Sequence, residues 1–436
     1  MTHPRPRPPW VSALAGLGAI ALVTGSIAVL VLTRDSRSDQ PQVATLPAAG
    51  PGACGPPAER PFLDPPGPTP PPPAPVSIPG ATEIDLRGFA VTEVVAGGGQ
   101  AWASVVEPDR DPTVASGRLA RIDAGSGALA GMIPVVERCS ITALAIGEGG
   151  VWAGTCDELA ASDADGGGLV VRVDPATGAV AGQSPLPTSC IADVTAGSGS
   201  VSASSHALAG EAAQVWRVDP ITGVVTETEQ LVEDALGGIA VTDDGVWVQE
   251  LGGDGDEAVR SDAETGAEEA SVPEEDAVLV GGGGDAVWFQ RPGLIVQRDA
   301  ATGSVRTETP LGDVQTAAIG ESGAWFQQAT RGSLTITIGR IDPATGAVTH
   351  TFGFEGVDLD RTGLPFPVRL AVDETGVWIV YQGRLFQAPL PGAPAPETTL
   401  PPSAPPPSAP ETTTTTITPP STTVPASTTL PASPTT

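Results

Sequence analysis

Two short runs of carboxylates have the residue types that bind calcium. They are Asp163-Ala-Asp-Gly166 and Asp254-Gly-Asp-Glu257. Calcium is held by oxygen ligands, largely from Asp and Glu, but neither run completes the loop of an EF-hand. We therefore predict Asp254, Asp256 and Glu257 as a candidate metal site with calcium as its ion, and we predict no other cofactor. The alternative is that these carboxylates belong to a solvated acidic surface.

The cysteines are a second group with chemistry to offer. The chain has four of them, Cys54, Cys139, Cys156 and Cys190. If Gly147–Gly150 forms the turn between two antiparallel strands, Cys139 and Cys156 lie nearly opposite each other, so we predict a disulfide between them. The pairing of Cys54 and Cys190 stays open. A metal site is the rival interpretation, but the C-x-x-C spacing typical of one is absent.

Catalytic groups are scarce. Beyond the N-terminal leader the only histidines are His206 and His350. His206 falls in a variable loop and could act as a base, whereas His350 follows a tight turn in an expected outer strand. No nucleophile elbow, P-loop or H-E-x-x-H motif is present. We assign no catalytic residue and predict that the protein is not an enzyme.

The charge of the chain limits its partners. The formal net charge is −30. Acidic residues, Glu274 among them, greatly outnumber arginines such as Arg291 in the expected loops. Nucleic acids and anionic membrane surfaces are therefore poor partners, because phosphate binding needs clustered Lys or Arg. A cation or a cationic partner fits the charge better.

The elements that must position these residues are repeats. The segment Arg172-Val-Asp-Pro-Ala-Thr-Gly178 has six copies, which begin at Arg121, Arg172, Arg217, Arg260, Arg298 and Arg340. The Asp side chain can accept backbone N–H bonds, Pro presets φ for a type I turn, and Gly allows a positive φ. Each copy is therefore predicted to be a β-hairpin turn with a Gly bulge.

A second repeated element places tryptophan after a Gly-rich turn. Its tryptophans are Trp102, Trp152, Trp247, Trp288, Trp325 and Trp378, and Gly199-Ser-Val-Ser202 is a degenerate seventh copy. We expect these rings to pack between sheets, since large aromatic residues dominate such cores. The copies follow one another at intervals of about 37 to 53 residues, close to the repeat length of propeller blades.

The predicted fold is therefore all-β: a seven-bladed β-propeller of four-stranded antiparallel blades over residues 81–392. Seven tryptophan-type strands but only six Asp turns leave the last blade one strand short. The segment 81–86 can supply that strand by pairing with Arg384-Leu-Phe386. Such closure would remove two exposed sheet edges.

The Val-Trp strand, the Arg-Ile-Asp-Pro-Ala-Thr-Gly turn and the repeat length resemble the bacterial YVTN-type and streptogramin (virginiamycin) B lyase-like β-propeller repeats. The resemblance covers about residues 81–392 and implies the propeller fold. The lyases depend on a His, acidic residues and a magnesium ion, but no motif here allows these catalytic residues to be carried over. Such repeats serve binding, sensing and enzymatic proteins alike.

The two ends of the chain have a different composition. Residues 1–10 form a short leader, and residues 11–33 are uncharged and long enough to span a bilayer, which predicts a transmembrane signal anchor. Residues 34–80 are a Pro-rich linker. Residues 393–436 consist largely of Pro, Thr, Ser and Ala and are predicted to be a disordered tail.

These features lead to one functional prediction. We expect a single-pass protein of the cell membrane with a cytoplasmic N-terminus and an extracytoplasmic, monomeric propeller ring. Its predicted role is that of a binding or adhesion module for an extracellular protein, a glycan or a cation. The alternatives are the sensor domain of a receptor, which a leader of about ten residues makes less favourable, and a lyase-like enzyme.

Overall fold

The computed structural model describes residues 52–53, 77–107, 117–137, 139–157, 167–205, 213–230, 236–250, 256–263, 265–274, 276–312, 314–320, 323–329, 332–356 and 368–390. The chain divides into two units, Met1–Ala393 and Pro394–Thr436, and all of the described residues belong to the first. No helix within these ranges is long and apolar enough to cross a membrane. The leader 1–10, the predicted anchor 11–33, most of the linker and the tail 393–436 lie outside them.

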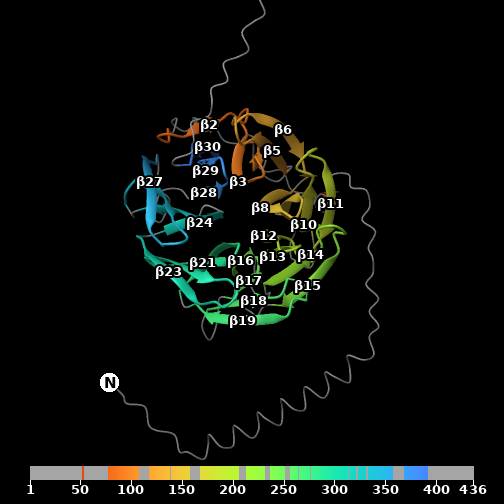
Figure 1. The fold of residues 1–436 in the computed structure, drawn as a ribbon. Coiled ribbons are helices and arrows are strands. Elements are labelled where there is room, and N and C mark those ends of the chain that lie inside the picture. The colour runs from red at the N-terminus through yellow and green to blue at the C-terminus, as the bar shows by residue number, and fades with distance from the viewer. Residues whose placement is uncertain are drawn as a thin grey trace, which may run out of the picture. The chain divides into compact units, whose positions relative to one another are not determined.

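Seven four-stranded antiparallel sheets form a ring of blades (Figure 1). Blade 1 has β3 (Ala90–Gly97), β4 (Gln100–Val106), β5 (Arg118–Asp123) and β6 (Leu129–Pro134); blade 2 has β8 (Ser140–Gly147), β9 (Gly150–Cys156), β10 (Leu169–Val173) and β11 (Val180–Pro185); blade 3 has β12 (Ile191–Gly197), β13 (Ser200–Ser205), β14 (Gln214–Val218) and β15 (Val225–Gln230). Blade 4 has β16 (Leu236–Thr242), β17 (Gly245–Glu250), β18 (Glu257–Ser261) and β19 (Glu268–Pro273); blade 5 has β20 (Val278–Gly283), β21 (Ala286–Arg291), β22 (Leu294–Asp299) and β23 (Val305–Pro310). Blade 6 has β24 (Val314–Gly320), β25 (Gly323–Ala329), β26 (Thr335–Ile341) and β27 (Val348–Glu355); blade 7 has β28 (Arg369–Val372), β29 (Gly376–Tyr381), β30 (Arg384–Pro389) and β2 (Thr82–Ile84). The predicted number of blades and of strands in each blade is confirmed.

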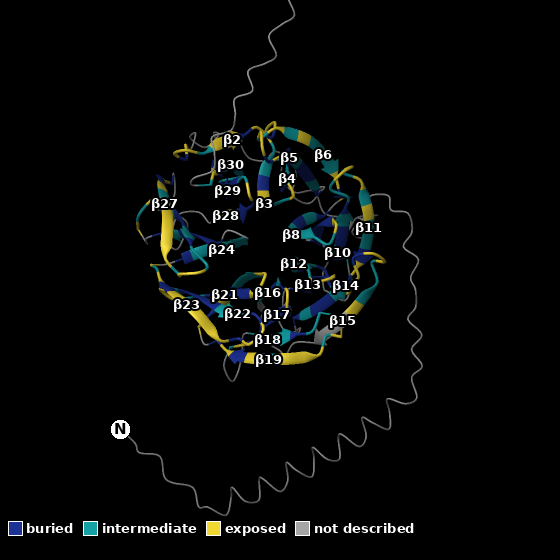
Figure 2. Ribbon diagram, viewed as in Figure 1, coloured by how far each residue is buried: buried dark blue, intermediate teal, exposed yellow. Residues whose placement is uncertain are grey.

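The repeat tryptophans fill the space between blades, as predicted. All six are at most 2% exposed. Burial follows the position of a strand within its blade. The second strands, such as β9 and β13, are almost fully buried, and the inner strands, such as β12 and β24, are mostly half-buried. The outer strands β19, β23 and β27 are largely exposed (Figure 2). In blade 3, Ser202 occupies the tryptophan position of β13 and is also buried.

The Asp turns have the predicted geometry. In blade 2, the Asp174 carboxylate accepts N–H bonds from Ala176 (2.9 Å) and Thr177 (2.8 Å). The Gly178 N–H donates to the Asp174 carbonyl at 2.8 Å, and Gly178 has a φ of 73°. These bonds fix the turn locally, and the pKa of the Asp174 carboxyl is lowered because the carboxylate accepts hydrogen bonds from Thr177.

The arginine of the repeat joins one blade to the next, a role that the sequence did not reveal. Arg172 of blade 2 donates to the Pro220 carbonyl of blade 3 at 2.9 Å. Equivalent bonds run from Arg121 to Pro175 and Ala176, from Arg217 to Ala263, and from Gln387 to Ala124. In each case the acceptor includes the residue that follows the turn Asp of the next blade. This hydrogen bond ties neighbouring blades together at four of the seven junctions, those from blade 7 through blade 1 to blade 4.

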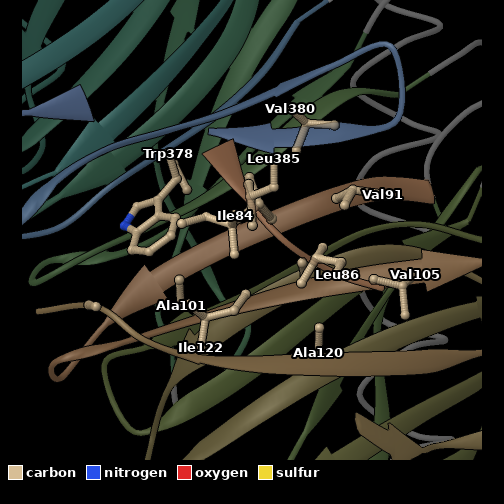
Figure 3. Close-up of a cluster of buried hydrophobic side chains, with 14 residues drawn as sticks. Ile84, Leu86, Val91, Ala101, Val105, Ala120, Ile122, Trp378, Val380 and Leu385 are labelled. Atoms are coloured by element: carbon tan, nitrogen blue, oxygen red, sulfur yellow. The ribbon is translucent and has the colours of Figure 1, made fainter. Parts of the chain in front are cut away.

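The N-terminal strand closes the ring, as predicted. The strand spans Thr82–Ile84 within the predicted segment 81–86 and pairs antiparallel with β30. Ile84 and Leu86 pack with residues of blade 7, such as Trp378, and of blade 1, such as Ile122 (Figure 3). Glu83 also forms an ion pair with Arg384. One short strand therefore contributes to the cores of the first and last blades at once.

The predicted Cys139–Cys156 disulfide is wrong. Cys156 is bonded to Cys190, and the Cα atoms of this pair are 4.0 Å apart. Within blade 2 the residue opposite Cys156 is Ser140. Beyond that pair, the end of β9 meets the beginning of the inner strand of blade 3 in an antiparallel bridge between Cys156 and Cys190. The prediction considered pairing only within a blade, whereas the actual bridge joins two blades.

Cys139 takes part in a disulfide as well. It lies just after β7 (Val136–Glu137), which pairs in parallel with β1 (Gly52–Ala53). Cys54 lies outside the described residues. The short β1–β7 pairing brings a segment of the predicted linker alongside the ring.

Candidate functional site in the central channel

The inner strands of the blades surround the axis of the ring, which is called the channel below, and share an irregularity (Figure 1). Six of the seven have a β-bulge near their beginning, as between Val91 and Glu93 in β3 and between Ile191 and Asp193 in β12. A bulge re-aims the side chain beside it. In both strands the residue that follows the bulge is acidic.

Three charged residues share one level of the ring. In each blade, one residue of the inner strand pairs with the tryptophan position of the second strand. Glu93, Asp193 and Arg369 each lie two residues before that inner-strand residue in their own blades. Glu93 and Arg369 come from neighbouring blades, and the Arg369 Nε is 2.9 Å from the Glu93 Oε1. Among the described residues, Asp193 forms no ion pair with an arginine. The channel therefore holds one more acid than base at this level.

Asp193 is the most perturbed acid of the described ring. Its Oδ1 accepts the Val194 N–H at 2.8 Å, and its carboxylate also accepts the Ile239 N–H of blade 4. Burial raises the pKa of Asp193 to about 7, and the negative charge of Glu93 adds to the rise while the two hydrogen bonds oppose it. Burial also raises the pKa of Glu93, which Arg369 counteracts. Asp193 remains only half-buried because it borders the channel.

A hollow of about 460 Å³ adjoins Asp193. Its lining comes from the inner strands of blades 2 to 6 and includes Ile239, Gly281 and Ile319. Turn residues such as Ser198 and Asp243 also line it. The hollow therefore lies toward the face on which the tight turns gather, and an acid whose pKa is near neutrality borders it. This arrangement can hold a small cationic group and can take up or release a proton near neutral pH.

No protein-family model matches the chain, and no curated protein matches it. Solved structures do match. The β-propeller domain of Cps50 (Swd1) from Myceliophteria thermophila is 12% identical with a TM-score of 0.50, over 72% of this chain and 99% of that one. A chain of the mitotic checkpoint complex is 11% identical with a TM-score of 0.50, over 75% of this chain and 96% of that one.

The fold is a β-propeller. At this identity the likeness concerns the fold alone. The resemblance to the YVTN-type and streptogramin B lyase-like repeats therefore stays a prediction.

Two of the predicted metal ligands, Asp256 and Glu257, are described, and neither lines the channel hollow. Asp254 lies outside the described residues. The Asp256 carbonyl accepts the Glu274 N–H at 2.8 Å, and the Glu257 carboxylate accepts a hydrogen bond from the Ser271 hydroxyl within blade 4. In the described ranges no group of three His, Cys, Asp or Glu residues is arranged to hold a metal. The calcium site at Asp254, Asp256 and Glu257 stays a prediction.

Two other groups of interest have clear positions. Glu274, expected on the acidic loops, is fully buried between Arg291 and Arg298 of blade 5, so it is a structural residue. His350 lies exposed in the outer strand β27, as expected. His206 lies outside the described residues.

Sequence reasoning missed the channel residues because it looked for function in the variable loops. The repeat does contain the signal. Glu93 precedes Trp102 by nine residues, Asp193 precedes Ser202 by nine, and Arg369 precedes Trp378 by nine. Aligned on the tryptophan, the other blades have Ala143, Gly238, Leu279 and Thr316 at this position. Charged residues in three blades, at a repeat position that is uncharged in the other four, are a signal in the sequence that could have identified these channel residues.

Proposed function

We propose that this protein is an exported binding module, held at the membrane by residues 11–33, that receives a cationic group at the channel. The observation that carries the proposal is the hollow of about 460 Å³ beside Asp193. A formal net charge of −30 favours the approach of cations from a distance. The role proposed is binding rather than catalysis.

The electrostatics of the channel favour a cation over an anion. Arg369 is committed to Glu93 at 2.9 Å, which leaves Asp193 and Asp243 as the acids nearest the hollow. A carboxyl with a pKa near 7 is kept protonated by its surroundings, and a cation in the hollow would favour its charged form. Binding and deprotonation of Asp193 are therefore coupled in this proposal.

The disulfide supports an extracytoplasmic ring. Structural disulfides persist in oxidising compartments and are rare in the cytosol. Cys156–Cys190 joins blades 2 and 3 of the folded ring. With the uncharged segment 11–33, this bridge supports a cytoplasmic N-terminus and an outer ring. Protease added to intact cells should degrade the ring, and a ring that resists until the cells are lysed would contradict the proposed orientation.

Cation binding can be tested on the full-length protein in detergent with spermine as the probe. Spermine should raise the melting temperature, because a ligand that binds only the native state stabilises it. The rise should be larger at pH 8 than at pH 6, since Asp193 is charged only above its pKa of about 7. Asp193→Asn should remove this pH dependence, whereas Glu308→Gln on the exposed outer strand β23 should not. An equal response of Asp193→Asn and the wild type would refute the proposal.

A further inference from the structure

The indole of a complete blade fills the space toward the next blade on the tight-turn side. In blade 2, Trp152 lies opposite Arg172 in the strand register, and the guanidinium carbon is 5.6 Å from the ring centroid. The Trp152 Nε1 donates to the Gly147 carbonyl at 3.0 Å. In blade 4, the ring of Trp247 reaches Gly303 in the turn of blade 5, where an added Cβ would be 3.5 Å from the ring. The tryptophan thus occupies the junction beneath the neighbouring turn.

Blade 3 keeps the arginine of this pair and lacks the ring. Ser202 lies opposite Arg217 in the same register. Arg217 still donates to the Ala263 carbonyl of blade 4. The Gly197 carbonyl, equivalent to the acceptor of the Trp152 bond, accepts a hydrogen bond from the Ser200 hydroxyl at 3.5 Å. The junction therefore keeps the inter-blade arginine bond of blades 1 and 2, but its aromatic ring is absent.

A hollow of about 410 Å³ lies at this junction. Its lining is polar and consists of the backbone of Gly199, the side chains of Val224 and Ala263, and six polar residues: Ser198, Ser200, Arg217, Asp219, Thr222 and Thr226. Ser200 is the equivalent of Gly150 of blade 2, where an added Cβ would be 3.0 Å from the Trp152 Nε1. Arg217 is the equivalent of Arg172, which lies over the Trp152 ring. A cavity of roughly 150 Å³ is enough to admit benzene, so the hollow has room for an indole.

Blade 5 supplies the opposite case. It keeps Trp288 and has Gln297 in place of the arginine. A hollow of about 330 Å³ lies there, lined by Trp288, Gln297 and Pro343 of blade 6. Blade 7 also lacks the arginine, because Gln387 lies opposite Trp378. Described hollows thus lie at two of the three junctions in which one member of the tryptophan–arginine pair is missing. Only the blade 3 hollow presents a guanidinium without its ring.

We propose that the blade 3 hollow binds an aromatic ring supplied by a ligand, which stacks on Arg217 where the other blades place their own tryptophan. A guanidinium attracts the face of an aromatic ring, most strongly that of an indole. The hydroxyls of Ser198, Thr222 and Thr226 line the hollow and can form hydrogen bonds with polar atoms on the edge of that ring. This site is distinct from the channel and does not depend on the function proposed for it.

The test uses the full-length protein in detergent and two probes, free indole and the tripeptide Gly-Trp-Gly. Binding is measured by ligand-observed NMR and by titration calorimetry, with cyclohexanol as a non-aromatic control. Both Ser202→Trp, which places an indole opposite Arg217, and Arg217→Gln should weaken binding. The expected loss for Arg217→Gln is about five- to thirty-fold, the range that corresponds to one cation–π contact.

Arg121→Gln is the matched control. It also removes an inter-blade bond, to Pro175 and Ala176, but it does so where Trp102 already fills the junction. Binding that survives Arg121→Gln and is weakened by Arg217→Gln supports the proposal even if Ser202→Trp does not fold. Stronger binding of the tripeptide would point to a side chain of a protein partner, and binding of indole alone to a small molecule. No saturable binding of either probe, equal binding of cyclohexanol, or unchanged binding in a folded Ser202→Trp variant would overturn it.

Discussion

The buried Glu274 provides the sharpest test of how the blades are held together. Glu274 follows the outer strand of blade 4 and is fully buried. It accepts hydrogen bonds from Arg291 of blade 5 at 2.8 and 3.2 Å and from Arg298 of the same blade. Glu274→Gln keeps the volume but leaves two guanidinium groups facing an uncharged amide. Removing one partner of a buried ion pair costs about 3 to 5 kcal/mol.

The structure places the expected loss near the lower end of this range. Arg298 is 12% exposed and also donates to the Gly303 carbonyl at 2.6 Å, so it stays partly satisfied. Arg291 is 30% exposed and can turn toward solvent. We therefore expect Glu274→Gln to lower the free energy of unfolding by about 3 kcal/mol. Glu269→Gln is the matched control: Glu269 pairs with Arg260 at 3.2 Å but is 41% exposed, and such pairs contribute about 0 to 1 kcal/mol.

Urea unfolding measures the difference, provided that tryptophan fluorescence and circular dichroism report the same midpoint, as two-state unfolding requires. A double-mutant cycle of Glu274→Gln with Arg298→Met isolates the coupling between these two residues. We expect the double variant to lose less than the sum of the two single losses. A loss for Glu274→Gln no larger than that for Glu269→Gln would refute the assignment of Glu274 as an inter-blade tie.

Three further predictions concern closure, pH and the disulfides. Deleting residues 1–88 should lower the melting temperature sharply, because it removes Ile84 and Leu86 from the core between blades 1 and 7. Deleting residues 1–76 should have a small effect, since this truncation retains the buried Ile78. Equal melting temperatures of the two truncated proteins would contradict closure of the ring by the N-terminal strand. The pKa of Asp193 rises from 3.8 to about 7 on folding. Between these pH values the native state binds more protons than the unfolded state, so the free energy of unfolding should fall as the pH rises. Asp193→Asn should flatten this pH dependence in urea titrations at pH 4 to 8. Cys139 is disulfide-bonded, Cys156 is bonded to Cys190, and Cys54 is the remaining cysteine of the sequence. Peptide mapping without reductant should therefore yield a disulfide-linked Cys54–Cys139 peptide. A free Cys54 thiol would contradict this pairing.

The parts of the fold that the sequence predicted are those that depend on local geometry. The Asp174 turn is fixed by bonds to Ala176 and Thr177, two and three residues away, so its residue types suffice to identify it. The tryptophan strands repeat because six of the seven blades fill the same junction with an indole. Closure by β2 followed from counting strands, since a ring with an unpaired edge would be exposed to edge-to-edge association.

The errors and omissions all concern contacts between blades. The Cys156–Cys190 bridge, the bonds from Arg172 to Pro220 and the burial of Glu274 each join residues of two neighbouring blades. The register within a blade can be derived from turns and alternation, but the offset of one blade against the next depends on how their side chains pack. No pattern within a single repeat contains that offset. The same reasoning applies to Asp193, whose perturbed environment includes Ile239 of the next blade and Glu93 of blade 1.

A repeat nevertheless carries information about function in the positions where one copy departs from the others. Most blades share the same tryptophan, arginine and Asp turn, and these shared residues serve the packing and turns that the blades have in common. Ser202 departs from this set, and a polar hollow lies at its junction. Asp193 departs from the uncharged residues found at its position in most blades, and the channel hollow adjoins it. Ser202 gives up the indole that the other blades bury at this position, and Asp193 places a carboxyl beside the channel hollow. We propose that each departure serves the binding of a ligand.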